Sequence, residues 1–316
     1  MPPDSDGTLD DDAWATPPEA GDLSPIPSGL VIVATPIGNL GDLTPRAAAA
    51  LAGADLVLCE DTRTTARLLA HAGVRARTEA LHDHNEAARV PALLDQLRAG
   101  RRIALVSDAG TPLVSDPGYR LVRAAVAAGL PVSAVPGANA AVMALVLSGL
   151  PPQPFLFLGF PPPRQAARLA ALARLRAAER AGLAATLVWH EAPHRLAETL
   201  ADLAAALGPR PAAVARELTK RFEEVRRGTL PQLAAHYAAE AARGEITVVV
   251  GPAPEEAAGE DALDAGLREA LTSGQSLKDA ATLVAGALGL PRKVAYARAL
   301  ELGREAAADD AGPGEA

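Results

Sequence analysis

This sequence contains very little cysteine, few aromatic residues and no long hydrophobic run. Cys59 is the single cysteine among 316 residues, so no intrachain disulfide can form, which is typical of a reducing compartment. The longest apolar stretch, around residues 140–150, is shorter than the roughly 20 residues that a membrane-spanning helix needs. The first residues are acidic and proline-rich, without the basic start and apolar run of a signal peptide. We therefore expect a soluble, cytoplasmic protein.

Several common cofactor-binding and catalytic motifs are also missing. No G-x-G-x-x-G follows the first expected strand and no GxxxxGK[ST] is present, which argues against a dinucleotide fingerprint and a P-loop. The nucleophile motif G-x-S-x-G is absent as well. His82 and His84 would share one face of an extended segment, but without a cysteine pair or an H-E-x-x-H motif we expect no metal site.

Acidic residues are concentrated at the two ends of the chain. Residues 1–28 carry seven acidic residues and no lysine or arginine, and residues 301–316 carry five acidic residues and one arginine. The formal net charge is −8 for the whole chain, whereas residues 29–300 carry +3. We expect residues 1–28 and 304–316 to be disordered tails. The mildly basic body permits a nucleic-acid partner without requiring one.

Short apolar runs alternate with helical segments through most of the chain. A threonine, a proline and a closing glycine, for example, mark a helix over residues 44–53. Over residues 30–147, such alternation indicates βα units and a largely parallel sheet. The proline-rich break Leu150–Pro154 separates an expected N-terminal α/β domain, residues 29–150, from a second α/β domain, residues 151–252.

A helical extension is expected over residues 263–303, after a linker rich in glycine, alanine and glutamate. It contains two helices separated by a Gly-Leu-Pro turn, an arrangement of the helix-turn-helix kind. The extension either packs as a helical hairpin on the body or on a partner chain, or it contacts nucleic acid. The residues that favour the second interpretation are Lys278, Arg292, Lys293 and Arg298.

Loops rich in Gly, Pro, Asp, Thr and Asn follow the expected strands. In open α/β sheets ligands bind beyond the carboxyl ends of the strands, so several of these loops are expected to enclose one site. In SDAGTPLVSDPG, residues 107–118, glycine and short polar residues allow close backbone approach to a ligand. Asp108 and Asp116 would repel phosphate, which favours a cationic or neutral adenosine-type ligand. Both aspartates could instead cap a turn or a helix. Capping is the better interpretation for Asp116, whereas for Asp108 capping and ligand binding explain the sequence equally well.

The loops together resemble those of a known family. The chain contains, in order, TPIGNLGDLTPRA, CEDTRTTARLL, LHDHNE, ALVSDAGTPLVSDPGYRLV, VPGANA, GFPPPR, HEAPHR, ARELTKRFEE and RGEITVVVGP. Over residues 29–251 it resembles the ribosomal RNA small-subunit methyltransferase I family of the tetrapyrrole-methylase-like superfamily. The resemblance implies an α/β fold of two domains with S-adenosylmethionine in the cleft between them, a C-terminal helical extension and a homodimer. The implied reaction is 2′-O-methylation of a cytidine ribose in 16S rRNA, in the decoding centre of the small ribosomal subunit.

The resemblance also implies which residues form the site. The expected cofactor-binding residues are Ile37, Gly38, Ser107, Asp108, Ala109, Gly110, Thr111, Pro112, Pro136, Gly137, Glu191, Glu217 and Leu218.

Methyl transfer requires that the ribose hydroxyl is positioned and loses its proton. His84 and Asp61 are the candidate bases, and Arg63, Asn85 and Lys220 are candidates for orienting ribose or phosphate. Structural alternatives exist for most of them: Asn85 can cap a helix, Asp61 can pair with Arg63, and Lys220 can pair with a glutamate three residues earlier.

A run of basic residues follows the same part of the chain. It either tracks phosphates or forms a solvated helix face, and its members are Arg216, Lys220, Arg221, Arg226 and Arg227. Two other functions stay open at this point. One is a tetrapyrrole methylase, which the aromatic content of 3% disfavours, and the other is a non-catalytic RNA-binding assembly protein.

Overall fold

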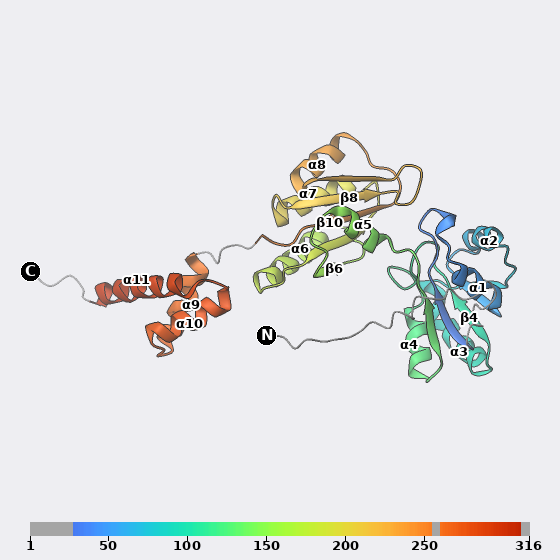
Figure 1. Ribbon diagram of the computed structural model, residues 1–316, viewed down its shortest axis with the longest axis horizontal. Coiled ribbons are helices and arrows are strands. Elements are labelled where there is room, and N and C mark those ends of the chain that lie inside the picture. The colour runs from blue at the N-terminus through green and yellow to red at the C-terminus, as the bar shows by residue number, and fades with distance from the viewer. Residues whose placement is uncertain (1–27, 255–259, 311–316) are drawn as a thin grey trace, which may run out of the picture. The chain divides into compact units, whose positions relative to one another are not determined.

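The computed structural model describes residues 28–254 and 260–310, and Figure 1 shows their helices and strands. The chain divides after Pro252 into two compact units. The expectation of disordered tails falls largely on residues 1–27 and 311–316, which lie outside the described residues. Where the expected C-terminal tail begins, at residue 304, the last helix continues as far as Asp310.

The first sheet is entirely parallel, as the alternation of apolar runs and helices predicts. Its strands lie in the order β3-β2-β4-β1-β5. The strands are β1 (Gly29–Val33), β2 (Leu56–Cys59), β3 (Thr78–Ala80), β4 (Arg102–Leu105) and β5 (Val132–Val135). The helices that follow them are α1 (Pro45–Gly53), α2 (Thr62–His71), α3 (Asp83–Arg98), α4 (Tyr119–Ala127) and α5 (Ala140–Ser148), with a short 3-10 helix at Leu40–Asp42.

Successive residues of these strands face opposite layers of helices. On β2, Leu56 and Leu58 cluster with side chains of α3 and α4, whereas Val57 and Cys59 cluster with side chains of α1 and α2. This alternation follows from the two-residue period of a strand. Because both faces are covered, β2 reads in the sequence as a continuous apolar run.

The second sheet is mixed, in contrast to the first. Its order is β6-β7-β10-β8-β9, and the β6–β7 pair is parallel while the other pairs are antiparallel. A short connection joins β8 directly to β9, and no helix lies between them, so the two strands pair as antiparallel neighbours. The strands are β6 (Phe155–Phe157), β7 (Thr186–Glu191), β8 (Pro211–Arg216), β9 (Glu224–Thr229) and β10 (Ile246–Val250).

Helices cover both faces of the second sheet, and one of them follows a strand of the first. The helices α6 (Gln165–Arg180), α7 (Leu196–Leu207) and α8 (Leu230–Ala239) cluster on one face (Figure 1). The opposite face is covered by α5, whose Ala144 and Leu145 cluster with Val188, Ala213 and Val249. Although α5 follows β5 in the chain, it therefore belongs to the core of the second sheet.

Three helices form the C-terminal unit in the part of the chain that the structure describes. They are α9 (Glu260–Thr272), α10 (Leu277–Leu288) and α11 (Arg292–Asp310), with their own core of leucine, alanine and valine. Ser276 caps the start of α10, and Gly289 adopts the left-handed conformation (φ 66°) that ends it. Arg298 joins α11 to α9 through two contacts of 2.6 Å to the carboxylate of Asp264. None of the described helices of the chain is long and apolar enough to cross a membrane.

A buried ion pair holds two helices of the second sheet to the start of β8. Both side chains of the pair Arg210–Glu179 are 2% exposed, and two contacts of 2.6 and 2.8 Å join the guanidinium to the carboxylate. Arg210 also donates to the carbonyl of Leu207 at the end of α7 (3.1 Å). The pair therefore links α6, α7 and the start of β8.

We expect Glu179→Leu to lower the free energy of unfolding by about 3–5 kcal/mol, because it leaves the guanidinium of Arg210 buried without its carboxylate. Urea unfolding followed by circular dichroism measures this loss. The double variant Glu179→Leu/Arg210→Met removes both charges and should recover most of the stability. Equal destabilisation of the single and the double variant would show that shape, and not charge, is what the pair contributes.

Candidate active site

Two adjacent cavities lie where loops of the first sheet meet loops of the second. The first has a volume of about 350 Å³ and the second about 420 Å³. The first cavity is lined by residues 108–111, 114–116, 139–140, 190–193 and 244–247 together with Ile37, Phe160, Ala215 and Leu218. The second cavity is lined by residues 35–38, 64–65, 67–68 and 107–109 together with Leu40, Lys220 and Glu245. Ile37, Asp108, Ala109 and Glu245 line both, so the two cavities share a wall.

The loop after β4 is held against the loop after β1 by backbone hydrogen bonds. Thr35 and Gly110 exchange two of them, at 2.8 and 3.1 Å, and Gly110 adopts a left-handed φ of 81°. Leu113 and Ser115 in the same loop also have positive φ, of 71° and 69°. Such backbone is costly for residues with a side chain and is found mainly at functional sites.

The loop after β8 is strained in the same way and carries an ion-pair cluster. Glu217 and Thr219 have φ of 51° and 67°, and with Leu113 and Ser115 they are the positive-φ residues other than glycine among the described residues. The ammonium group of Lys220 lies 2.9 Å from the carboxylate of Glu217 and 3.1 Å from that of Glu245. Burial alone would lower the pKa of Lys220, but the two hydrogen-bonded carboxylates raise it by a larger amount. The pKa of Lys220 therefore lies above its ordinary value.

Two glycines allow this cluster to form. A Cβ on Gly38 would lie 2.4 Å from the Cγ of Lys220, and a Cβ on Gly244 would lie 2.3 Å from the carboxylate of Glu217. Both glycines also have positive φ, of 154° and 81°. A side chain at either position would displace the ion pairs that hold the loop after β8.

Carboxylates dominate the charge of the first cavity. Burial, together with the neighbouring charges of Glu60 and Asp108, raises the pKa of Asp116 to about 6. Burial also raises the pKa of Asp108, whose carboxylate accepts the backbone N–H of Asp61 at 3.2 Å. Neither lysine nor arginine is among the described residues that line this cavity. The cavity therefore favours a ligand with a positive charge.

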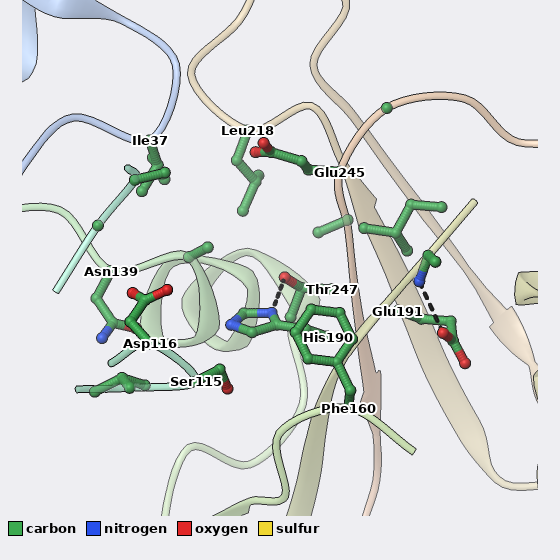
Figure 2. A pocket seen from close by; sticks show the side chains of 18 of the residues that line it. Ile37, Ser115, Asp116, Asn139, Phe160, His190, Glu191, Leu218, Glu245 and Thr247 are labelled. Carbon is green, nitrogen blue, oxygen red and sulfur yellow. Dashed lines mark hydrogen bonds between the residues drawn. The ribbon is translucent and has the colours of Figure 1, made fainter. Parts of the chain in front are cut away.

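His190 projects into the first cavity from the end of β7 (Figure 2). Its Nδ1 lies 3.1 Å from the hydroxyl of Thr247, and its ring packs against Phe157 and Phe160 at centroid distances of 5.0 and 5.7 Å. Burial lowers the pKa of His190, so the imidazole is neutral at neutral pH. Within the described residues, no group of three or more His, Cys, Asp or Glu side chains could hold a metal ion.

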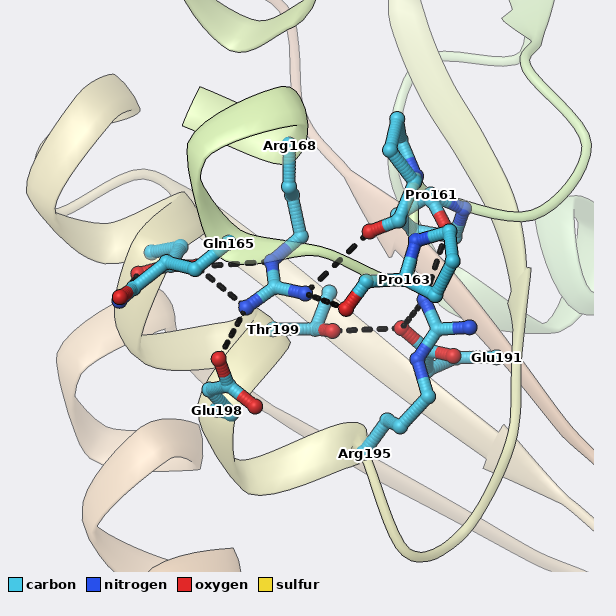
Figure 3. A network of polar contacts seen from close by, with 10 residues as sticks. Pro161, Pro163, Gln165, Arg168, Glu191, Arg195, Glu198 and Thr199 are labelled. Atoms are coloured by element: carbon cyan, nitrogen blue, oxygen red, sulfur yellow. Dashed lines mark hydrogen bonds and ion pairs between the residues drawn. The ribbon is translucent and has the colours of Figure 1, made fainter. Parts of the chain in front are cut away.

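The carboxylate of Glu191 belongs to a buried network and not to the cavity surface (Figure 3). It accepts the N–H of Ala192 at 2.7 Å, pairs with Arg195 at 3.3 Å and accepts the hydroxyl of Thr199. Arg195 also donates to the carbonyl of Pro161 at 2.6 Å. The network thus fixes the two segments that carry Phe160 and His190.

A second arginine in the network holds the proline segment from the other side. Arg168 is 1% exposed and donates to Asp202 at 2.7 Å and Glu198 at 2.6 Å. It also contacts the carbonyls of Pro162 and Pro163, at 3.3 and 3.4 Å (Figure 3). Arg168 could not be recognised as buried from the sequence, because an arginine on an alanine-rich helix is typical of a surface position.

The residues expected to bind a cofactor lie near one another, but not all of them line a cavity. Those that line the first cavity are Ile37, Asp108, Ala109, Gly110, Thr111, Glu191 and Leu218. Gly38 and Ser107 line the second cavity. Pro112, Pro136, Gly137 and Glu217 line neither. The lining residues that sequence reasoning missed include Phe160, His190 and Thr247, and the motifs GFPPPR and HEAPHR were the signal for the first two.

Of the five candidate catalytic residues, Lys220 is the one that lines a cavity, namely the second. Asp61 and Arg63 form an exposed ion pair with a 2.7 Å contact. Asn85 accepts the backbone N–H of His82 at 3.0 Å and donates to the carbonyl of Ala80 at 3.1 Å, which is a capping role. His84 lies exposed in the first turn of α3, so this segment is the start of a helix and not the extended segment that the sequence suggested.

Most of the basic residues between Arg216 and Arg227 have partners within the protein. Arg216 and Arg226 both pair with Glu224, at 3.0 and 2.8 Å. Arg227 donates to the carbonyls of Leu147 and Ser148 at the end of α5. The guanidinium of Arg221 lies 5.5 Å from the ring centroid of Phe222. These residues therefore stabilise the edge of the second sheet, in addition to any role that they have at the surface.

Comparisons with known proteins agree on the relatives of this chain. Residues 29–234 match the family model described as Tetrapyrrole (Corrin/Porphyrin) Methylases, and residues 256–303 match the RsmI C-terminal HTH domain. A protein named ribosomal RNA small subunit methyltransferase I from Mesorhizobium japonicum is 47% identical, over 88% of this chain and 93% of its own. One of the same name from Micromonospora olivasterospora is 51% identical, over 84% of this chain and 85% of its own.

Among solved structures, the methyltransferase CobJ is similar in fold. The TM-score is 0.53 at 22% sequence identity, over 72% of this chain and 95% of that one. This likeness confirms the expected α/β fold with two sheets.

We expect the charge of Asp116 to destabilise the folded protein above pH 6. The pKa of Asp116 is raised from 3.8 to about 6 in the folded protein. Between pH 3.8 and about pH 6 the folded state therefore keeps a proton that the unfolded state has lost. The free energy of unfolding falls as the pH rises through this range. Asp116→Asn should therefore raise the free energy of unfolding at pH 7.5 by about 1–2 kcal/mol, less than the full shift implies because the group is not fully buried. Urea unfolding at pH 7.5 and at pH 4.5 measures the difference.

The gain should shrink at pH 4.5, where the folded wild-type protein already carries most of this proton. Asp95→Asn, a change at an exposed carboxylate that lines neither cavity, is the matched control and should change stability little at either pH. An equal gain for Asp116→Asn at both pH values would mean that its charge is not the cause.

Proposed function

We infer the reaction from one premise: this chain belongs to the ribosomal RNA small subunit methyltransferase I family of the tetrapyrrole methylases. It is an S-adenosylmethionine-dependent enzyme that methylates ribosomal RNA. We propose that the acceptor is the 2′-hydroxyl of a cytidine ribose in 16S rRNA. The observation that carries the proposal is the shared wall of two cavities, with Asp108 in it, because methyl transfer needs donor and acceptor side by side.

The residues of the first cavity fit S-adenosylmethionine. Its volume of about 350 Å³ is that of a small-molecule site. Ala109 and Gly110 expose backbone groups to an adenosine, while Ile37 and Leu218 provide apolar contacts. Asp108 and Asp116 balance the positive sulfonium. When bound, the cofactor supplies an electrophilic methyl group.

The second cavity has the chemistry of a nucleotide site. Arg67 and Lys220 line it and provide positive charge for a phosphate, and the hydroxyl groups of Thr64 and Thr65 offer hydrogen bonds. Lys220 is held in place by Glu217 and Glu245 and stays protonated because its pKa is raised. It therefore acts as a positioning group and not as a base.

Asp108 is the residue best placed to accept the hydroxyl proton. Asp108 lines both cavities, and its carboxylate accepts a hydrogen bond from the backbone N–H of Asp61. Burial raises its pKa, which makes the carboxylate more basic. With the cofactor bound, Asp108 would take the proton of the ribose oxygen that accepts the methyl group, while the carbon–sulfur bond breaks and the sulfur leaves as a neutral thioether. The initial candidates Asp61 and His84 line neither cavity.

We further propose that the enzyme is a homodimer that acts in the cytoplasm, where it meets the small ribosomal subunit. Exposed apolar side chains support the dimer: Val142 and Val146 of α5 are 43% and 64% exposed. Sedimentation of the purified protein tests the oligomeric state directly.

The first experiment is mass spectrometry of rRNA nucleosides from cells with and without this gene. We expect the deletion to remove one 2′-O-methylcytidine and the wild-type gene to restore it, whereas Asp108→Asn does not. In single-turnover assays with 16S rRNA, Asp108→Asn should lower the rate about 10²–10⁴-fold, the usual contribution of a general base.

The controls separate the roles of Asp108. Asp95→Asn, at an exposed position, should restore the nucleoside fully. Calorimetry of S-adenosylmethionine binding shows whether Asp108→Asn still binds the cofactor; retained binding with a lost rate supports the role as proton acceptor, and equal loss of both assigns Asp108 to binding alone. Unchanged nucleosides in the deletion strain would contradict the proposed reaction.

A further inference from the structure

The C-terminal unit contains a groove lined by basic residues that the methyl-transfer site does not use. It has a volume of about 440 Å³ and is lined by Lys278, Arg292, Lys293 and Tyr296, which we call the basic groove. All four side chains are exposed. Lys278 lies in the first turn of α10, and the other three lie in the first turns of α11, so the groove is formed where two helices begin.

The cations of the basic groove have no carboxylate partner among the described residues. Arg298, farther along α11, differs from them because it pairs with Asp264 and with Glu301, at 2.6 and 2.8 Å. The nearest acidic residue in sequence is Asp279, whose side chain accepts the hydroxyl of Ser276 at 2.6 Å in the cap of α10. Arg298 is thus a structural residue, while the groove keeps three positive charges.

The three positive charges of the basic groove do not stabilise the fold. The first turn of a helix has unpaired backbone N–H groups and a partial positive charge, so cations there are unfavourable and anions are favourable. A bound polyanion would neutralise the partial positive charge at the two helix starts and the charges of the three side chains. Tyr296, 40% exposed in the same groove, adds an aromatic surface on which an unpaired base can stack.

The connection between the two helices supports the same partner. Three residues, Gly289 to Pro291, join α10 to α11, which is the short turn of a helix-turn-helix motif. In such motifs the N-terminal residues of the second helix contact nucleic acid. In this chain those residues are Arg292 and Lys293.

We propose that the basic groove binds phosphates of 16S rRNA other than that of the target nucleotide, and so anchors the substrate while the two cavities perform the chemistry. The proposal rests on the proposed rRNA methylation. The groove adds affinity for RNA and leaves the methyl-transfer step unchanged.

The test compares full-length wild-type protein with Lys278→Ala/Arg292→Ala/Lys293→Ala in binding and turnover with unmethylated 16S rRNA. The triple variant should bind the RNA about 10-fold more weakly or worse at 0.1 M salt. The slope of log affinity against log salt should fall by about 2, since each lost phosphate contact removes about 0.7–0.9. The KM for RNA should rise by a similar factor, while kcat at saturating RNA and the affinity for S-adenosylmethionine stay unchanged.

The matched control is Arg268→Ala/Arg304→Ala, which removes two exposed arginines of the same unit that do not line the groove. It should change the RNA affinity less than 3-fold. Arg292→Gln/Lys293→Gln is a second, milder variant, and it should give an intermediate loss even if the triple variant folds poorly. Tyr296→Leu should weaken binding to single-stranded RNA more than to a duplex.

The outcomes separate this proposal from the proposed function. If the wild-type protein does not methylate rRNA, the proposed function fails. If it does, and the triple and double variants keep the wild-type RNA affinity and salt slope, the basic groove does not bind RNA. A change of oligomeric state in the variants, with unchanged RNA affinity, would overturn the proposal in favour of a second copy of this chain in the groove.

Discussion

The packing of α5 against the second sheet is the contact on which the rest of the structure depends. This helix follows β5 of the first sheet after a few residues, yet Ala144 and Leu145 are buried against the second sheet. Burying one such leucine contributes about 1.5–3 kcal/mol. Because Ile37 and Leu218 join the same cluster, the loops of both sheets meet beside α5 and enclose the first cavity.

The cavities depend on charges that are compensated unevenly. Beside the second sheet, Lys220 lines the second cavity and contacts two carboxylates, so its positive charge is fully compensated. On the first sheet, Asp108 and Asp116 face the cavity with raised pKa values and without such partners among the described residues. The resulting negative potential attracts a cationic cofactor, and the same desolvation makes Asp108 a stronger base.

Much of the fold could be predicted because it is encoded locally. Thr44 caps α1 with its side chain as the sequence predicts, and apolar runs mark the buried parallel strands. β9 was missed because a charged edge strand, EVRRGT, has no apolar period. In the site, the loops were predictable, and so was the local pairing of Asp61 with Arg63, but the direction of the Glu191 carboxylate, which turns away to Thr199, was not. Such pairings arise from tertiary packing, which one sequence does not reveal.

The distribution of arginine explains why the chain carries two kinds of basic region. In the first unit, arginines such as Arg210, Arg216 and Arg227 bind carboxylates or carbonyl groups of the protein itself, so they contribute to its stability. An enzyme that acts on RNA still needs cations whose partners are phosphates, because affinity for RNA comes mainly from the backbone. Lys278, Arg292 and Lys293 meet that need on a separate helical unit. Separating the anchoring charges from an acidic cofactor cavity allows both requirements to be met in one chain.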